Sequence, residues 1–288
     1  MKQALLSCGL GVTLLAGAAP AIAQDQPPEA PAKVLQIIRE EIKSGRATAH
    51  EKFESGYVRA YRNAKRAPYL AMSTLTGPSE AWYIVSFPSY EAFETESDAI
   101  AKDTTLSAEL ERLDEVDSAF RTGGRTMVAE YKPELSYRAR GDISGVHYVE
   151  VTIVRVRPGH NREYQDLATL SKKAHEQANV DEHFAVYEIE SGMPIGTYVV
   201  FAGLNSLAQL DTDTHTQAYR DAVGDEGRAK MQKLIADSLI SADRMVFQFS
   251  PRMSNPPAWL AKGDPEFWSV PKPVMRPAMP KPSAKPTP

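Results

Sequence analysis

The sequence predicts an α+β protein that contains two tandem split βαβ units, each with four strands and two helices. The first observation behind this prediction is a weak internal match, in which residues 41–46 align with residues 155–160 at an offset of 114. The offset then grows slowly, so that residues 126–128 align with residues 244–246. The second observation is that both copies show strand-like and helix-like patterns in the same order. A diverged duplication accounts for both observations.

The second copy shows the pattern more clearly than the first. Residues 148–156 are rich in β-branched side chains and end at a Pro158-Gly159 turn, which is typical of a strand. Apolar residues then recur at helical spacing over residues 161–178. A strand followed by a helix is therefore expected at the start of the second unit.

Two strands, a helix and a last strand complete this copy. Ser206 is a suitable helix N-cap, and Gly224 and Gly227 are expected to interrupt the helix that it begins. The expected ranges are 184–189 and 197–201 for the two strands, 206–239 for the interrupted helix and 245–249 for the last strand.

In the first copy, residues 34–42 carry charges that would also suit a helix, but the match to the second copy favours a strand. Ser89 is a suitable N-cap for the second helix of this copy. We expect the sheet of each unit to have helices on one face and an apolar opposite face, so that the two units pack sheet against sheet. The predicted boundaries are residues 33–138 for the first repeat, 146–252 for the second repeat and 253–270 for a C-terminal extension.

The two ends of the chain differ from this pattern. Residues 1–23 read as a signal peptide with a short basic start, an apolar stretch and cleavage after Ala23, so a periplasmic or secreted protein is expected. Residues 24–32 and 271–288 are rich in proline and are expected to be disordered. No later segment reaches the ~20 consecutive apolar residues of a membrane-spanning helix.

Composition excludes several classes of function. Cys8 lies in the predicted signal peptide and is the single cysteine, which excludes a disulfide framework and a cysteine nucleophile in the mature chain. The formal net charge is −4, so the chain lacks the excess of positive charge on which nucleic-acid binding relies, and we exclude that function. Neither a Gly-x-Ser-x-Gly nucleophile motif nor a phosphate-binding glycine loop is found.

The element order, together with a turn at Gly45 and Gly159 after the first strand of each copy, resembles the dimeric α/β-barrel superfamily of ferredoxin-like units. This superfamily includes the antibiotic-biosynthesis monooxygenases, the EthD-like proteins and the NIPSNAP-like proteins. The resemblance implies an intrachain barrel made by the two repeats and a small apolar or aromatic ligand held between helices and sheet. No catalytic signature of these families maps onto the sequence.

Five of the six histidines lie in the second copy, which suggests a site there. We expect His175, Asp211 and His215 to line one cleft as catalytic residues, because Asp211 and His215 share a helical face and the two helices are neighbours in this fold. The expected ligand-binding walls of the cleft are four tyrosines, Tyr164, Tyr187, Tyr198 and Tyr219. The alternative is a purely structural interpretation, in which the histidines lie at the boundary between core and surface and the tyrosines are aromatic residues of the core.

Three functions stay open at this point, and whether the chain is an enzyme is one of the open questions. The first is a noncatalytic protein that binds a small apolar or aromatic molecule. The second is a cofactor-independent oxygenase or isomerase with a histidine general base. The third is an envelope interaction protein that uses its basic tail, residues 271–288. No metal and no cofactor are expected, because no close ligand motif such as His-x-x-x-His is found.

Overall fold

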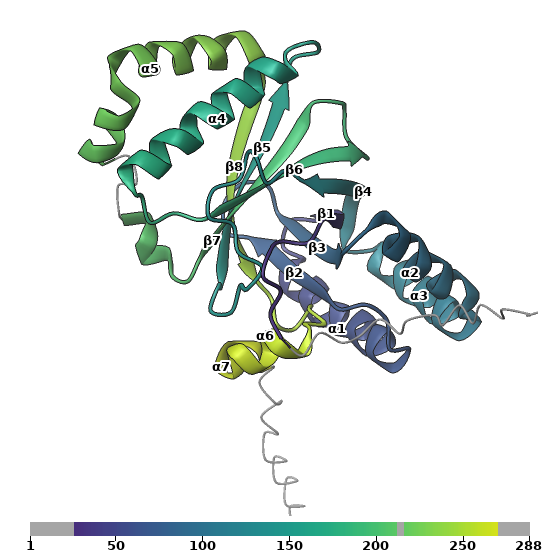
Figure 1. Ribbon diagram of the computed structural model, residues 1–288. Helices are drawn as coiled ribbons and strands as arrows, with labels where there is room; N and C mark the ends of the chain where they lie inside the picture. Colours follow the sequence, from purple (N-terminus) through teal and green to yellow (C-terminus); the bar gives the residue numbers. More distant parts are fainter. Residues whose placement is uncertain (1–25, 212–215, 270–288) are drawn as a thin grey trace, which may run out of the picture.

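The computed structural model of the protein describes residues 26–211 and 216–269 (Figure 1). The predictions of a signal peptide over residues 1–23 and of a basic tail over residues 271–288 lie outside the described residues, as does His215. Within the described ranges, none of the helices has the length and apolar character needed to cross a membrane.

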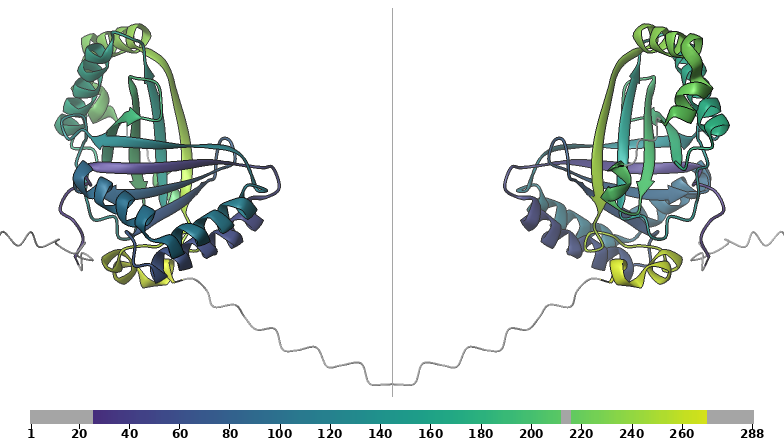
Figure 2. Two further views of the ribbon diagram at one scale, coloured as in Figure 1. Left: turned by 90° about the vertical axis from the view of Figure 1, so that its right-hand side faces the viewer. Right: turned by 90° about the vertical axis from the view of Figure 1, so that its left-hand side faces the viewer.

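Eight antiparallel strands close into a barrel, with helices on its outside (Figure 2). The order of the strands around the barrel is β1-β3-β2-β8-β5-β7-β6-β4. The bounds of the strands are β1 Val34–Ile42, β2 Tyr69–Thr74, β3 Glu80–Phe87, β4 Arg121–Tyr131, β5 Tyr148–Val156, β6 Phe184–Ser191, β7 Thr197–Leu204 and β8 Leu239–Phe249. An α+β fold with a closed barrel is thus confirmed.

The two halves of the chain join through the edges of their sheets. Strand β2 pairs with β8, where Met72 faces Phe249, and strand β4 pairs with β6, where Ala129 faces Ile189. Edge pairing satisfies the backbone groups that two stacked open sheets would leave exposed. The expected packing of two sheets is therefore accompanied by hydrogen bonding between their edges.

The helices differ from the prediction mainly by being divided. Asp103 ends one helix of the first half and caps the next, because its carboxylate accepts a hydrogen bond from the backbone N–H of Leu106 at 2.9 Å. The expected helix after Ser206 is split into a short 3₁₀ helix and a long helix that is kinked at Gly224, where φ is 65°. The bounds are α1 Ala47–Asn63, α2 Tyr90–Lys102, α3 Thr104–Asp117, α4 Asn161–Ala178, η1 Leu207–Asp211, α5 Gln217–Ser238, α6 Ala258–Gly263 and α7 Pro265–Trp268.

Several local predictions are confirmed. Residues 34–42 form a strand, paired along its length with β3 and β4. The hydroxyl of Ser89 accepts a hydrogen bond from the backbone N–H of Ala92 at 3.1 Å and so caps α2. Helix α4 begins and ends at the residues that the periodicity indicates.

The main core lies inside the barrel. It takes buried side chains from all eight strands, among them Trp82 of β3 and Phe247 of β8, whose ring centroids lie 5.1 Å apart. Leu260 and Trp268 join the same cluster from α6 and α7, which close one end of the barrel (Figure 1). The predicted C-terminal extension therefore contributes to the core.

The two halves share details beyond their order of elements. Strand pairing shifts register after Glu41 in β1 and after Arg155 in β5, which are 114 residues apart. The turns that follow place Gly45 and Gly159 at φ values of +74° and +86°, where a side chain would be strained. These details agree with a tandem duplication, which stays a prediction.

Candidate metal centre

Helix α1 places two ionisable side chains on the face that packs against the sheet. His50 and Glu54 are four residues apart and are both buried, with the His50 side chain 2% exposed. Val58 belongs to the same face and packs on the sheet, whereas Gly56 and Ala60 face α3. The helix therefore holds an imidazole and a carboxyl group at fixed positions over the barrel wall.

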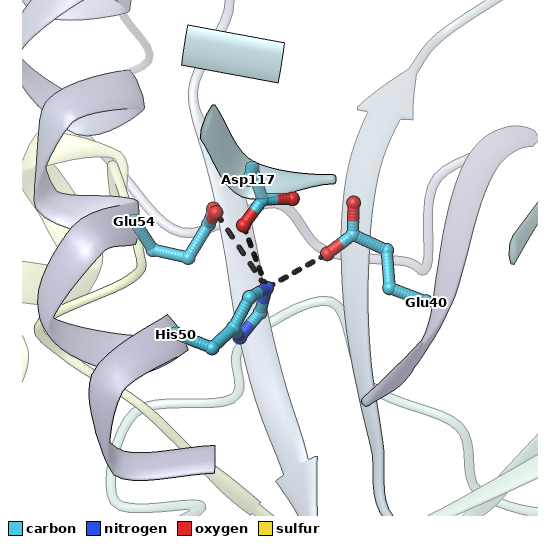
Figure 3. Close-up of side chains that lie close together, drawn as sticks. All are labelled: Glu40, His50, Glu54 and Asp117. Carbon is cyan, nitrogen blue, oxygen red and sulfur yellow. Dashed lines mark hydrogen bonds and ion pairs between the residues drawn. The ribbon is translucent and has the colours of Figure 1, made fainter. Parts of the chain in front are cut away.

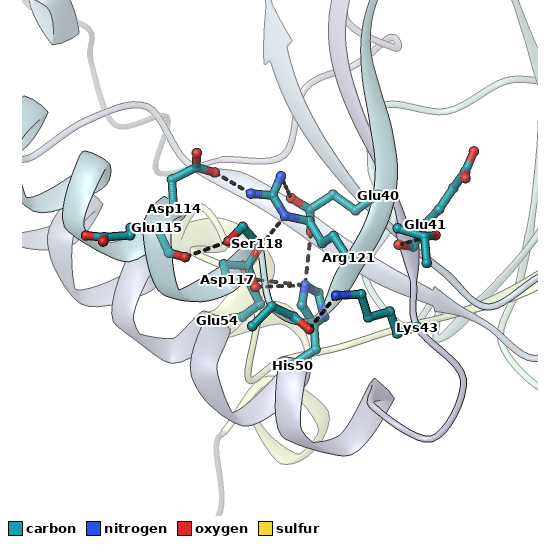
Figure 4. A network of polar contacts seen from close by, with 12 residues as sticks. Glu40, Glu41, Lys43, His50, Glu54, Asp114, Glu115, Asp117, Ser118 and Arg121 are labelled. Atoms are coloured by element: carbon teal, nitrogen blue, oxygen red, sulfur yellow. Dashed lines mark hydrogen bonds and ion pairs between the residues drawn. The ribbon is translucent and has the colours of Figure 1, made fainter.

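Three other elements complete the cluster. In β1, side chains alternate between the faces of the sheet, so Glu40 points to the same outer side as Ile38 and Ile42 and meets α1. Asp117 is the last residue of α3 and is buried, and Arg121 follows it as the first residue of β4. Residues from four elements thus meet beneath the first turns of α1 (Figure 4).

Three carboxylate oxygens surround a single nitrogen of His50 (Figure 3). The Nε2 atom lies 3.0 Å from Oε2 of Glu40, 3.6 Å from Oε1 of Glu54 and 3.5 Å from Oδ1 of Asp117. An N–H group donates one good hydrogen bond, so it cannot satisfy all three acceptors. By contrast, ligand atoms around a tetrahedral ion with bonds of about 2.1 Å lie about 3.4 Å apart.

Arg121 binds the outer oxygens of two of these carboxylates. Its Nη1 lies 3.1 Å from Oε1 of Glu40 and its Nε lies 2.6 Å from Oδ2 of Asp117, while Nη2 pairs with the exposed Asp114. The inner oxygens of Glu40 and Asp117 are left facing His50 (Figure 4). Outer-shell partners commonly orient metal ligands in this way.

Asp117 is not fully satisfied by these contacts. Its side chain is 1% exposed, and within the described part of the chain neither of its carboxylate oxygens accepts a hydrogen bond of good geometry. Both oxygens lie within ion-pair distance of His50 or Arg121, but the angles are poor for hydrogen bonding. A buried carboxylate in this state favours an additional cation in the cluster.

The charges of the cluster do not balance without a further positive group. Burial, followed by the neighbouring Glu40 and Asp117, raises the pKa of Glu54 to about 9. Burial, followed by Glu40, raises the pKa of Asp117 to about 6 against the opposing effect of His50 and Arg121. Three ionised carboxylates and one guanidinium leave two negative charges, which either two protons or one divalent cation would neutralise.

A surface hollow of about 440 Å³ gives access to the cluster. Glu40 and Arg121 form part of its wall, beside Ser118, Thr122 and Thr126. Gly124 has no side chain there, and an added Cβ would lie 2.9 Å from the backbone oxygen of Arg39. Because Glu40 and Arg121 line the hollow, a small molecule bound there would contact these two residues.

The matching place in the second half is apolar. Val154 occupies in β5 the position of Glu40 in β1, and Leu239 pairs with Val156 as Arg121 pairs with Ile42. Val154 and Leu239 pack together with Tyr164 of α4 in one hydrophobic cluster. Ordinary apolar packing is thus sufficient at this position of the fold, so the polar cluster of the first half has no evident structural necessity.

Among the described residues, the structure does not bring His175 and Asp211 into one cleft. His175 is buried, and its ring nitrogens bond to the backbone oxygen of Ser171 at 2.7 Å and to Oε2 of Glu182 at 2.9 Å. Asp211 is exposed at the end of η1, and His215 lies outside the described residues. Both nitrogens of His175 are therefore occupied, and its catalytic role, like that of Asp211 and His215, stays a prediction.

The four predicted tyrosines lie in three different places. Tyr164 packs on Tyr198 at 4.4 Å between α4 and the sheet, and Tyr219 of α5 packs on His175 at 4.8 Å. Tyr187 belongs to the core inside the barrel. Tyr187 of β6 pairs with Val199 of β7, and Tyr198 is the next residue to Val199, so Tyr187 and Tyr198 point to opposite faces of the sheet. The four tyrosines therefore do not line one cleft in this structure, and ligand binding by any one of them stays a prediction.

Sequence reasoning missed the cluster because it looked for two histidines. The spacing of His50 and Glu54 on an otherwise apolar helix face was the available signal, as was a glutamate between Ile38 and Ile42 in a strand. Asp117 is 67 residues from His50 in the chain, and only the fold brings them together.

Comparison with known proteins supports the fold. No protein-family model and no curated protein matches the sequence. The "putative monooxygenase" of Fusobacterium nucleatum superposes with a TM-score of 0.51 at 10% identity, covering 76% of this chain and 93% of that chain. The anthrone oxidase-like protein superposes with a TM-score of 0.50 at 16% identity, covering 77% and 94%. This chain shares their fold. The comparison therefore confirms the fold, and membership of the dimeric α/β-barrel superfamily stays a prediction.

Proposed function

We propose that this protein binds a divalent metal ion at Glu40, His50, Glu54 and Asp117 and binds a small molecule beside it. The observation that carries the proposal is the placement of three buried carboxylate oxygens 3.0–3.6 Å from one imidazole nitrogen. All four ligand atoms lie within 4.8 Å of one another, which is close enough for one ion.

The donor set indicates which ions suit the cluster. One imidazole nitrogen and three carboxylate oxygens suit Mn²⁺, Fe²⁺ or Zn²⁺ better than a soft ion such as Cu⁺, which prefers sulfur ligands. His50 would supply the nitrogen, and Arg121 would hold Glu40 and Asp117 in place. When bound, such an ion can polarise an oxygen atom of a substrate or lower the pKa of a bound water.

The small molecule is expected in the hollow that borders the cluster. Serine, threonine and arginine side chains line much of this hollow, so it suits a polar molecule with an anionic or oxygen-donor group better than the purely apolar ligand expected from the sequence. The similarity in fold to a protein named a monooxygenase and to one named anthrone oxidase-like supports a small-molecule ligand.

Isothermal titration calorimetry of the chelator-treated protein with Mn²⁺ and Zn²⁺ tests the proposal. We expect one site per chain. Asp117→Asn should weaken binding by ~10-fold or more, since even an outer-shell partner commonly costs 10–100-fold. Asp114→Asn is the matched control, because Asp114 lies on the same helix and touches Arg121 without facing His50. Equal affinities of the two variants, or absence of binding to the unmodified protein, would contradict the proposal.

A second candidate is a metal-free enzyme that uses acid and base catalysis. The raised pKa of Glu54, about 9, means that this group carries a proton at neutral pH beside the imidazole of His50. An oxygenase or isomerase without a cofactor would use such a pair. This candidate predicts no calorimetric signal with metals and a Glu54 carboxyl resonance that titrates near pH 9 in carbon NMR.

We also propose that the protein works outside the cytoplasm. The composition of residues 1–23 supports this, because a short basic start, an apolar stretch and a small-residue cleavage site are typical of a signal peptide. N-terminal sequencing of the protein expressed from its full-length gene should begin at Gln24. An N-terminus at Met1 in a cytoplasmic fraction would contradict export.

If the protein interacts with the cell envelope through its tail, deletion of residues 271–288 should remove that association and leave the fold intact.

A further inference from the structure

A second hollow lies where the C-terminal extension meets the barrel, away from the Glu40–Arg121 hollow. Its volume is about 500 Å³. Residues of α1, of the strand ends and of the extension line it, namely Glu51, His147, Pro251, Arg252, Asp264, Glu266, Phe267 and Ser269. No residue of the candidate metal centre belongs to this lining.

His147 and Asp264 form a close pair in this hollow. Nε2 of His147 lies 2.6 Å from Oδ2 of Asp264, and the ring of Phe267 stacks on the imidazole at 4.0 Å with an interplanar angle of 10°. The other oxygen of Asp264 accepts the backbone N–H of Phe267 at 3.1 Å. The carboxylate and the imidazole are therefore both held in one orientation, although 117 residues separate them in the chain.

The pairing determines which nitrogen is available to a ligand. A carboxylate accepts hydrogen bonds, so Nε2 of His147 carries the proton and Nδ1 is the acceptor of a neutral ring. Among the described residues, no hydrogen bond is made by Nδ1. The His147 side chain is 30% exposed, so a molecule in the hollow can reach it.

Charge indicates the kind of ligand. The lining contains the carboxylates of Glu51, Asp264 and Glu266 against the single guanidinium of Arg252. Ser250 already donates a hydrogen bond to Glu51, and His147 donates one to Asp264, whereas Glu266 is exposed at the rim. An ammonium group offers three N–H donors, which match an imidazole acceptor and two carboxylates.

We propose that this hollow is a second ligand site, in which Nδ1 of His147, oriented by Asp264, accepts a hydrogen bond from a small molecule that bears an ammonium group. The site does not depend on the metal centre, since the two share no side chain. Arg252 at the same wall would accommodate a carboxylate on the same ligand.

Nitrogen NMR of the full-length mature protein with ¹⁵N-labelled histidine tests the proposal. The probes are propylammonium, β-alanine and propionate, which carry a cation, both charges and an anion. We expect saturable shifts of the His147 Nδ1 resonance with propylammonium and β-alanine. Glu266→Gln changes an exposed residue and should leave the fold intact. It should weaken the binding of propylammonium and of β-alanine several-fold. Asp264→Asn should change the ratio of the His147 tautomers, an effect that loss of packing alone would not produce.

His183→Gln is the matched control, because His183 is also partly exposed beside an aspartate, Asp181, yet lies outside the hollow. It should leave the affinities unchanged. Saturation by propionate alone, or no saturable shift with any probe, would overturn the proposal. So would binding that appears only after deletion of residues 271–288, because the occupant would then be the basic tail of the chain itself.

Discussion

Arg121 is the residue on which the buried acids of the first half depend. It contacts Glu40 and Asp117, whose side chains are 10% and 1% exposed. Arg121→Met should lower the free energy of unfolding by about 3–5 kcal/mol in the absence of metal, because it leaves these carboxylates without their counter-charge. Saturating Mn²⁺ should recover part of this loss.

Urea denaturation at neutral pH measures this effect. Arg112→Met is the matched control, because Arg112 pairs with the exposed Glu109 on α3 and its replacement should not change stability measurably. Equal effects of the two substitutions would show that the Arg121 contacts contribute little.

His175 is expected to make stability depend on pH. Burial alone would lower its pKa, but the hydrogen bonds to Glu182 and to the Ser171 carbonyl, together with the Glu182 charge, raise it. A raised pKa in the folded state adds stability that is complete below the unfolded value of about 6.5 and is lost as the pH rises through the folded value.

The advantage of the unmodified protein over His175→Gln should therefore be largest near pH 5.5 and decrease above neutrality. Urea titrations at several pH values measure it, with His160→Gln as a control, because the His160 side chain is 39% exposed. An advantage that grows between pH 6 and pH 8 would contradict the assigned direction of the pKa shift.

At this scale the sequence carried little information about the site. No sequence motif marks Glu40, His50 and Asp117. They form a cluster only because the fold brings β1, α1 and α3 into contact. The concentration of histidines in the second copy drew attention to His175, which proves to be bonded at both nitrogens. A histidine's neighbours in space, rather than its neighbours in sequence, decide its function.

Among the elements, the contact between α1 and α3 positions the candidate metal centre. Gly56 of α1 faces Leu113 of α3, and an added Cβ would lie 2.8 Å from Cδ2 of Leu113. Gly56→Val should therefore push the helices apart and destabilise the protein by about 1–3 kcal/mol. Because α3 also carries Asp117, the same substitution should weaken metal binding.

A double-mutant cycle separates crowding from other effects of the substitution. Leu113→Ala makes room for the valine, so the two changes together should cost less than the sum of their separate costs. Strict additivity, measured by urea denaturation, would show that Gly56 and Leu113 do not limit the spacing of the helices.

Elements were predicted better than sites. Strands β1 and β5 and helix α4 begin and end where the patterns of the sequence indicate, because burial of one face imposes a period of 2 or 3.6. The division between α2 and α3 was missed because it depends on one local cap at Asp103 within a continuous helical pattern. The kink at Gly224 was expected, since glycine adopts a positive φ without strain.

The whole molecule is expected to unfold as one unit. All eight strands contribute side chains to the core inside the barrel, and both junctions between the halves are hydrogen-bonded strand pairs. Neither half can keep its inner face buried without the other. Far-ultraviolet and near-ultraviolet circular dichroism should therefore report one coincident thermal transition. Two separate transitions would indicate halves that fold independently.

The closed barrel was predicted from the order of elements and the resemblance, whereas the location of the polar cluster was not. Two similar halves leave equivalent places under α1 and α4, and apolar residues fill one while charged residues fill the other. Periodicity is the same for both fillings, because it records which positions are buried and not what they bind.

The location of a bound ion tests the proposed function most directly. Crystals grown with Mn²⁺ should show an anomalous-difference peak about 2.0–2.3 Å from Nε2 of His50 and from oxygens of Glu40, Glu54 and Asp117. Crystals saturated with Mn²⁺ that show no such peak, with His50 still hydrogen-bonded to Glu40, would contradict a metal centre in this fold.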